Sequence, residues 1–133
     1  MTAPVESLMS KKLVTVETSA TAFDVSREML DHDIGCILVL EKKKLAGIVT
    51  KSDILREAVM KRLDPQKIVV TELMTRPVVT IGSDGSLGDA SALMSKHNIT
   101  KIPVLSSGQL VGIITSTDLV RRSQPKKLAK DMI

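Results

Sequence analysis

An internal duplication constrains this chain more than any other feature of its sequence. The stretch LAGIVTKSDILR at residues 45–56 recurs as LVGIITSTDLVR at residues 110–121, an offset of 65 positions. The same offset aligns VESLMS at residues 5–10 with VTELMT at residues 70–75, and no gap is needed between them. A fixed period without insertions indicates two copies of one supersecondary unit, so the fold must build the same unit twice.

Composition predicts an aliphatic core and excludes several classes of protein. Hydrophobic residues make up 43% of the 133-residue chain, but Phe23 is its one aromatic residue. This argues against nucleic-acid readers that stack bases on aromatic side chains. The net charge of +4 suits anionic ligands, although so mild an excess also serves solubility alone. Since a single cysteine cannot form an internal disulfide, and no signal peptide or membrane-spanning run is apparent, we expect a cytoplasmic protein without membrane association.

Hydrophobic periodicity predicts the order β-α-β-β-α in each copy. In the first copy we expect a strand at 13–16, a helix at 22–32, a hairpin of strands 36–40 and 45–49, and a helix at 50–63. Ile54, Leu55, Ala58 and Val59 should face inward on that last helix. The second copy repeats this order, with strands at 77–81, 101–105 and 110–114 and helices at 87–97 and from 116 to about 123. Short helical lead-ins precede the copies at 5–10 and 68–74, and the Lys-rich tail 124–133 either extends the last helix or frays.

One copy alone is too small to bury both faces of a three-stranded sheet. We therefore expect a mixed α/β fold in which two tandem repeats pack about a pseudo-twofold axis and share a core. The predicted repeats are residues 1–65, with the N-terminal lead-in, and residues 66–133, with the basic tail. Together they should form one globular module.

The repeated Gly-Ile-Val/Ile-Thr-x-x-Asp motif lies where a strand runs into a helix. A helix N-terminus offers unpaired N–H groups and the positive end of the helix dipole, which suits phosphate or another polar ligand. Asp53 and Asp118 can accept two hydrogen bonds from a vicinal diol such as a ribose, and Thr50 and Thr115 can donate a hydroxyl beside them. Gly47 and Gly112, upstream on the strands, permit close approach of a backbone or a ligand.

Helix capping explains the same residues without any ligand. Ser or Thr followed by Asp three residues later has the form of a capping box, with Asp in place of the usual Glu. This spacing begins four predicted helices: Thr21 with Asp24, Thr50 with Asp53, Ser86 with Asp89, and Thr115 with Asp118. Local physics therefore leaves both interpretations open.

The remaining candidates favour structural roles. His32 and His97 end equivalent helices, where a cation stabilises the helix dipole, and two histidines without a cysteine or carboxylate cluster make a poor metal site. Cys36 falls in a predicted buried strand, and the lysines at 42–44 in a solvated hairpin tip. No nucleophile-base pair, paired carboxylates or Gly-rich phosphate loop stands out. The sequence thus predicts no catalytic residue, no metal and no enzyme activity.

The duplicated layout, the Leu-Met-Ser/Thr lead-ins, the Ile-Pro-Val strand at 102–104 and the two Thr-x-x-Asp junctions together resemble a tandem pair of CBS domains, also called a Bateman module. The resemblance covers roughly residues 5–122, with no catalytic domain attached. It implies a regulatory sensor that binds AMP, ADP, ATP, S-adenosylmethionine or a dinucleotide in clefts between the repeats and signals to a partner protein. It also implies a homodimer formed through the helices.

The resemblance assigns roles residue by residue. Asp53 and Asp118 would take the ribose hydroxyls, and Thr50, Thr115, Thr100 and Lys101 would serve hydroxyl or phosphate groups. Backbone atoms of the first strand in each repeat would contact the base: Val14, Thr15, Val16, Val79, Thr80 and Ile81.

The two repeats differ before the Ile-Pro-Val strand. The second repeat has Thr100 and Lys101 there, whereas the first has Gly35 and Cys36. We therefore expect unequal affinities, with phosphorylated ligands preferring the site that Lys101 faces. The alternative function is a dimerisation or nucleic-acid-binding scaffold without a small ligand.

Overall fold

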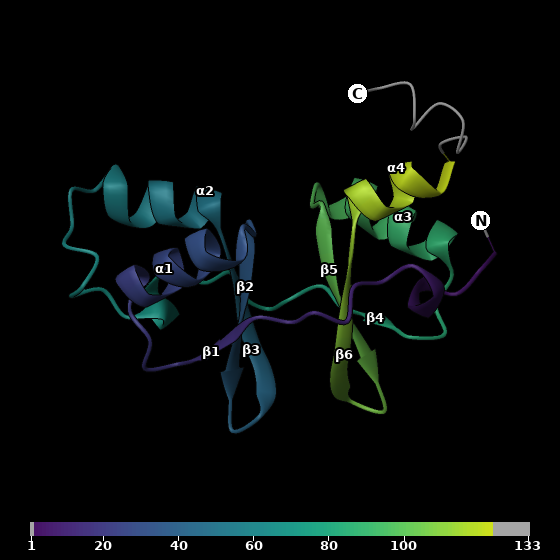
Figure 1. Ribbon diagram of the computed structural model, residues 1–133, viewed down its shortest axis with the longest axis horizontal. Coiled ribbons are helices and arrows are strands. Elements are labelled where there is room, and N and C mark those ends of the chain that lie inside the picture. Colours follow the sequence, from purple (N-terminus) through teal and green to yellow (C-terminus); the bar gives the residue numbers. More distant parts are fainter. Residues whose placement is uncertain (1, 124–133) are drawn as a thin grey trace. The chain divides into compact units, whose positions relative to one another are not determined.

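The computed structural model describes residues 2–123 and divides the chain into two compact units. One unit is Leu13–Val78, and the other combines the N-terminal segment up to Lys12 with the residues from Val79 onward (Figure 1). The predicted tail at 124–133 lies outside the described residues. The fold class is confirmed, because each unit is a mixed α/β structure built around one three-stranded sheet.

The two sheets repeat one topology. The first contains β1 (Thr15–Glu17), β2 (Cys36–Glu41) and β3 (Lys44–Thr50), and the second contains β4 (Ile81–Gly82), β5 (Lys101–Ser106) and β6 (Gln109–Thr115). In each, the first strand pairs parallel with the second, and the second pairs antiparallel with the third. Even the irregularity in the hairpin recurs, after Val39 and after Val104. The predicted strand at 77–81 is shorter than expected: Pro77 has no N–H to donate, and only β4 joins the ladder.

Two helices have the predicted bounds, α1 (Ala22–His32) and α3 (Leu87–His97). Their N-caps, Thr21 and Ser86, form capping boxes. Their C-caps, Asp33 and Asn98, are left-handed, a conformation that ends a helix. Local sequence therefore determines both ends of these helices. The last described helix, α4 (Ser116–Ser123), also begins where predicted.

The helix predicted at 50–63 is not continuous. It consists of a four-residue α2 (Lys51–Ile54) followed by a π-helical turn, η2 (Leu55–Val59). The prediction that Leu55 and Val59 face inward is wrong, since they are 56% and 55% exposed, whereas Ala58 is buried. A π-turn holds more residues than an α-turn, so the 3.6-residue periodicity that assigned these positions does not hold there.

The lead-in segments are exchanged between the repeats. The second lead-in, with η3 (Val70–Glu72), belongs to the first unit: the Val70 amide donates to Ala20 at 2.7 Å, and Thr75 pairs with Ile48 through two backbone bonds of 2.8 and 3.2 Å. The first lead-in, with η1 (Val5–Ser7), belongs to the second unit, where Val5 donates to Gly85 at 2.8 Å. The compact units therefore do not coincide with the repeats at 1–65 and 66–133.

The expectation of one shared core is corrected in the same way. Most of the buried apolar residues fall into two clusters, one in each unit, and each cluster contains residues of both repeats. Ile68, Val70 and Leu73 from the second lead-in join the cluster under the first sheet. Val5 from the first lead-in joins the cluster under the second sheet. Within the described residues, no helix is long and apolar enough to cross a membrane.

Candidate functional site

All four Ser/Thr-x-x-Asp sequences form reciprocal caps. At the first junction the Thr50 amide donates to Asp53 Oδ2 at 2.8 Å, and the Asp53 amide donates to Thr50 Oγ1 at 3.3 Å. The matching bonds between Thr115 and Asp118 are 2.9 and 3.2 Å. Hydrogen bonds from the backbone favour the ionised carboxyl: the pKa of Asp24 is lowered chiefly because the Thr21 amide donates to it. The capping interpretation is therefore confirmed, and any ligand role must come in addition to it.

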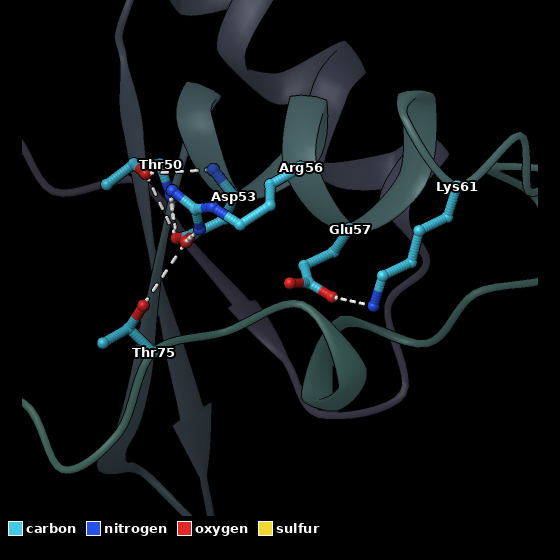
Figure 2. Close-up of polar contacts among 6 residues, drawn as sticks. All are labelled: Thr50, Asp53, Arg56, Glu57, Lys61 and Thr75. Atoms are coloured by element: carbon cyan, nitrogen blue, oxygen red, sulfur yellow. Dashed lines mark hydrogen bonds and ion pairs between the residues drawn. The ribbon is translucent and has the colours of Figure 1, made fainter.

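Asp53 is surrounded by donors (Figure 2). Its Oδ2 accepts from the Thr50 amide and, at 3.1 Å, from the Thr50 hydroxyl. Its Oδ1 accepts from Arg56 Nη1 at 3.2 Å and from the Thr75 hydroxyl at 3.4 Å. Asp53 is also 5% exposed, the one charged residue among the buried side chains of the described chain. Both carboxylate oxygens are thus engaged within the protein.

Glu57, the residue after Arg56, forms its ion pair with Lys61 and not with Arg56. Glu57 Oε2 accepts from Lys61 Nζ at 2.6 Å, and this bond lowers the pKa of the Glu57 carboxyl. Arg56 forms its ion pair with Asp53, although its own side chain is 62% exposed. The guanidinium therefore covers one oxygen of a buried carboxylate from the solvent side.

Asp118 is engaged on one side only. Its Oδ2 accepts from the Thr115 amide at 2.9 Å and from the Thr115 hydroxyl at 3.0 Å. Among the described residues, its Oδ1 accepts no hydrogen bond, and the residue is half-buried rather than buried. The equivalents of Arg56 and Thr75 are Arg121, which is exposed, and Ser10, whose hydroxyl accepts from the Lys12 amide at 3.2 Å. The second junction therefore retains free acceptor capacity.

Thr100 and Lys101 lie at the second junction. Lys101 pairs with Thr115 in the β5–β6 ladder, and the Ser116 amide donates to the Thr100 carbonyl at 2.9 Å. Lys101 Nζ is 3.5 Å from the Thr100 hydroxyl. The structure thus brings together Thr100, Lys101, Thr115 and Asp118. The equivalent positions at the first junction, Gly35 and the half-buried Cys36, offer no cation.

The residues predicted to contact a base lie at the outer strands. Thr15 and Val16 are in β1 and Ile81 is in β4, while Val14, Val79 and Thr80 precede these strands. Both strands stand at one end of their sheet order, so each has a strand neighbour on one side only. Backbone groups on the other side of an edge strand have no ladder partner in that sheet. A role of these residues in base recognition stays a prediction.

Gly47 and Gly112 occupy the same position in the two copies. The lead-ins, rather than a ligand, explain why both residues are glycines. A Cβ atom at Gly47 would lie 2.8 Å from Met74 Cγ. A Cβ atom at Gly112 would lie 2.9 Å from the backbone oxygen of Ser10. Both glycines therefore permit the close approach of the lead-in that packs on their strand.

The two histidines end α1 and α3 and lie outside the Thr-x-x-Asp motifs. His32 Nε2 lies 3.2 Å from Glu28 Oε2 on α1, and His97 is exposed at the end of α3. In the region from residue 2 to residue 123, no group of three or more His, Cys, Asp or Glu side chains could hold a metal ion. Sequence reasoning did not identify Arg56 or Thr75 as partners of Asp53. Only the i,i+3 spacing of Arg56 gave a signal, and Arg121 has the same spacing from Asp118.

Comparison with known proteins identifies the repeated unit. The family model of the CBS domain matches the chain twice, at residues 5–59 and 70–124. The chain belongs to the CBS-domain family. The two matches have the 65-residue offset of the duplication, so the chain is a tandem CBS pair.

Two solved structures resemble nearly the whole chain. An uncharacterized conserved protein from Pyrococcus horikoshii is 34% identical with a TM-score of 0.87, over 95% of this chain and 96% of that one. The CBS domain pair of protein MJ0100 is 29% identical with a TM-score of 0.83, over 92% of this chain and 96% of that one. That structure is a complex with 5′-methylthioadenosine and S-adenosyl-L-methionine.

A curated relative is longer than this chain. The uncharacterized protein MJ0450 of Methanocaldococcus jannaschii is 26% identical over 117 residues, which are 86% of this chain and 63% of the relative. The chain therefore spans less than two thirds of that relative.

Proposed function

We propose that this CBS pair is a non-catalytic regulatory module that binds an adenosyl ligand and signals its presence to a partner protein. The observation that carries the proposal is the grouping of Thr100, Lys101, Thr115 and Asp118 in one unit. Oδ1 of Asp118, which accepts no hydrogen bond from the described residues, can accept from ribose hydroxyls, and Lys101 supplies a cation for a phosphate or carboxylate. The adenosyl ligands bound to MJ0100 support this class of ligand.

The candidate ligands are AMP, ADP, ATP, S-adenosylmethionine and a dinucleotide such as NAD. At a ligand concentration about 100-fold above the dissociation constant, binding to the folded state stabilises it by about 2.7 kcal/mol. We expect at least one of these compounds to raise the melting temperature by several degrees in a thermal-shift assay. GMP and GTP serve as controls for nucleotides without adenine.

Lys101 gives the assay a second readout. Lys101→Ala should reduce the stabilisation by ATP more than that by adenosine, since only ATP carries phosphates. Lys96→Ala removes an exposed lysine of α3 and should change neither. If no adenosyl compound raises the melting temperature more than the guanine nucleotides do, the sensor proposal fails and the scaffold function is favoured.

We also propose that the module is a homodimer formed through its helices. Four apolar side chains follow α2 with large exposed fractions: Leu55, Val59, Met60 and Leu63. Val120 occupies the position of Leu55 in the other repeat and is 57% exposed. Exposed apolar side chains that gather in one short segment are typical of a protein interface.

Light scattering should therefore give about twice the chain mass of 14.4 kDa. Leu55→Glu combined with Val120→Glu should shift the mass toward the monomer, because buried carboxylates without partners oppose association. The matched Leu55→Met, Val120→Met variant should remain dimeric. A monomeric wild-type protein at high concentration would contradict this part of the proposal.

A further inference from the structure

The two Thr-x-x-Asp junctions have the same sequence pattern but different hydrogen-bond states. An ionised carboxylate has about four acceptor positions, two on each oxygen. At Asp53 four donor groups of the protein lie against them: the Thr50 amide and hydroxyl, Arg56 Nη1 and the Thr75 hydroxyl. At Asp118, among the residues that the structure describes, the two donors of Thr115 occupy Oδ2 and none occupies Oδ1.

We infer that the junctions have separate tasks in this chain. Asp53 fastens the second lead-in to the first sheet, a role that we call the clamp. Arg56 blocks the access of a ribose to Asp53. Asp118 is the junction open to an adenosyl ligand. The ligand half of this inference rests on the proposed function, whereas the clamp half does not.

The clamp follows from which elements meet at Asp53. Thr50 ends β3, Arg56 lies in η2, and Thr75 directly follows Met74, the last residue of the second lead-in. Thr75 is also held by two backbone bonds to Ile48 on the same strand. The contact of 3.4 Å between its hydroxyl and Asp53 Oδ1 is long for a hydrogen bond between oxygens. Arg56 therefore obstructs access of a ligand to Oδ1 more strongly than Thr75 does.

The equivalent elements do not meet at Asp118. Ser10 makes the same two backbone bonds, to Ile113, but its hydroxyl contacts the Lys12 amide. Arg121 makes no ion pair with Asp118 within the described part of the chain. A ribose diol donates two hydrogen bonds, and Oδ1 of Asp118 has two acceptor positions for them. At Asp53 the same diol must first displace Arg56 from a carboxylate that is 5% exposed.

Asparagine distinguishes the two states without a change of shape. An amide keeps one oxygen and replaces the other with an NH₂ donor. In Asp53→Asn that NH₂ must face either the Thr50 donors or Arg56 and Thr75, so a donor on a side chain that is 5% exposed meets other donors instead of an acceptor. In Asp118→Asn the amide oxygen can face Thr115 while the NH₂ faces the open side. We expect Asp53→Asn to lower the melting temperature by about 5–10 °C and Asp118→Asn by about 2 °C or less.

Binding is followed at each junction by amide resonances in ¹⁵N NMR spectra, with AMP as the probe at millimolar concentration. In the wild-type protein, AMP should shift the amide resonances of residues 115–118. The AMP concentration needed should be at least about tenfold lower than the concentration that shifts the amide resonances of residues 50–53. Asp118→Asn should weaken the response at 115–118 by at least about tenfold. Arg56→Ala should make residues 50–53 respond, and the matched Arg121→Ala should leave both junctions as in the wild type.

Each result decides one half of the inference. Equal losses of melting temperature in the two asparagine variants would overturn the clamp. Equal AMP affinities at the two junctions, or no gain at residues 50–53 in Arg56→Ala, would overturn the closed first junction. If AMP moves neither set of amides, the proposed function fails for this ligand together with the ligand half, and the melting temperatures still decide the clamp.

Discussion

A fragment of residues 13–78 is expected to fold on its own, whereas a fragment of residues 1–65 is expected to be unfolded as a monomer. The two have almost the same length, and both contain the whole first sheet and α1. They differ in the lead-in that they carry. The first includes η3 and every member of the apolar cluster under the first sheet. The second lacks η3 and carries η1, which packs on the other unit.

The missing lead-in has a large energetic effect. Ile68, Val70 and Leu73 are 5%, 0% and 3% exposed in the whole chain. Full burial of an aliphatic side chain contributes about 1.5–3 kcal/mol, so three contribute about 6 kcal/mol. The total stability of a small domain is about 5–15 kcal/mol, and a chain of this size has little to spare. Losing these contacts and the Val70 and Thr75 backbone bonds should therefore be enough to unfold the fragment.

Circular dichroism and NMR dispersion test this directly. Fragment 13–78 should give a cooperative thermal transition whose midpoint does not depend on concentration. Fragment 1–65 should fold only when two copies exchange lead-ins, since VESLMS resembles VTELMT, and its midpoint should rise with concentration. Equal, concentration-independent transitions would show that a repeat can use its own lead-in, and would contradict the exchange as a requirement for folding.

The sequence predicts those parts of this fold that local interactions determine. The bounds of α1 and α3 follow from a capping box at one end and Asp33 or Asn98 at the other. The hairpins follow from two apolar runs around a polar tip. The π-turn after Ile54 was not predictable from periodicity. The inward-facing positions were assigned at 3.6 residues per turn, and this spacing already assumes an α-helix.

Exchange of the lead-ins and the difference between the junctions are tertiary effects. The two lead-ins share Val, Leu and Met in the same order, so the hydrophobic pattern cannot tell which sheet each one covers. Both junctions read Thr-x-x-Asp-x-x-Arg, yet only Arg56 pairs with its aspartate in the part of the chain that the structure describes. Thr75 lies 22 residues from Asp53, at a distance where single-sequence reasoning has no signal.

The second large effect is expected at the glycines that admit the lead-ins. Gly112→Ala should destabilise the protein by about 1–3 kcal/mol, as overpacking of a tight contact does. The added Cβ would lie 2.9 Å from the Ser10 backbone oxygen, which accepts from the Ile113 amide at 3.0 Å. Because Ser10 also donates to Ile113 at 2.9 Å, moving this backbone strains both bonds that hold the lead-in on β6.

Gly47→Ala provides the matched comparison. The nearest atoms to its added Cβ all belong to the Met74 side chain, with Cγ at 2.8 Å and Cβ at 3.0 Å. Met74→Ala removes the Sδ and Cγ atoms that lie nearest to the added Cβ. It should therefore recover most of the stability lost through Gly47→Ala. Met9→Ala removes the side chain that faces Gly112 but not the Ser10 oxygen, so it should leave most of the loss caused by Gly112→Ala in place.

Double-mutant cycles by urea unfolding measure this difference as a coupling energy. The Gly47–Met74 pair should couple by about 1 kcal/mol or more, and the Gly112–Met9 pair by clearly less. Gly82→Ala, where the added Cβ meets only the exposed Asp84 side chain, should change stability by less than about 0.5 kcal/mol. Equal coupling at the two strands would mean that the first lead-in can shift away from β6 as easily as a methionine side chain can rotate. In that case the backbone pairing of Ser10 with Ile113 would not be what holds the first lead-in in place.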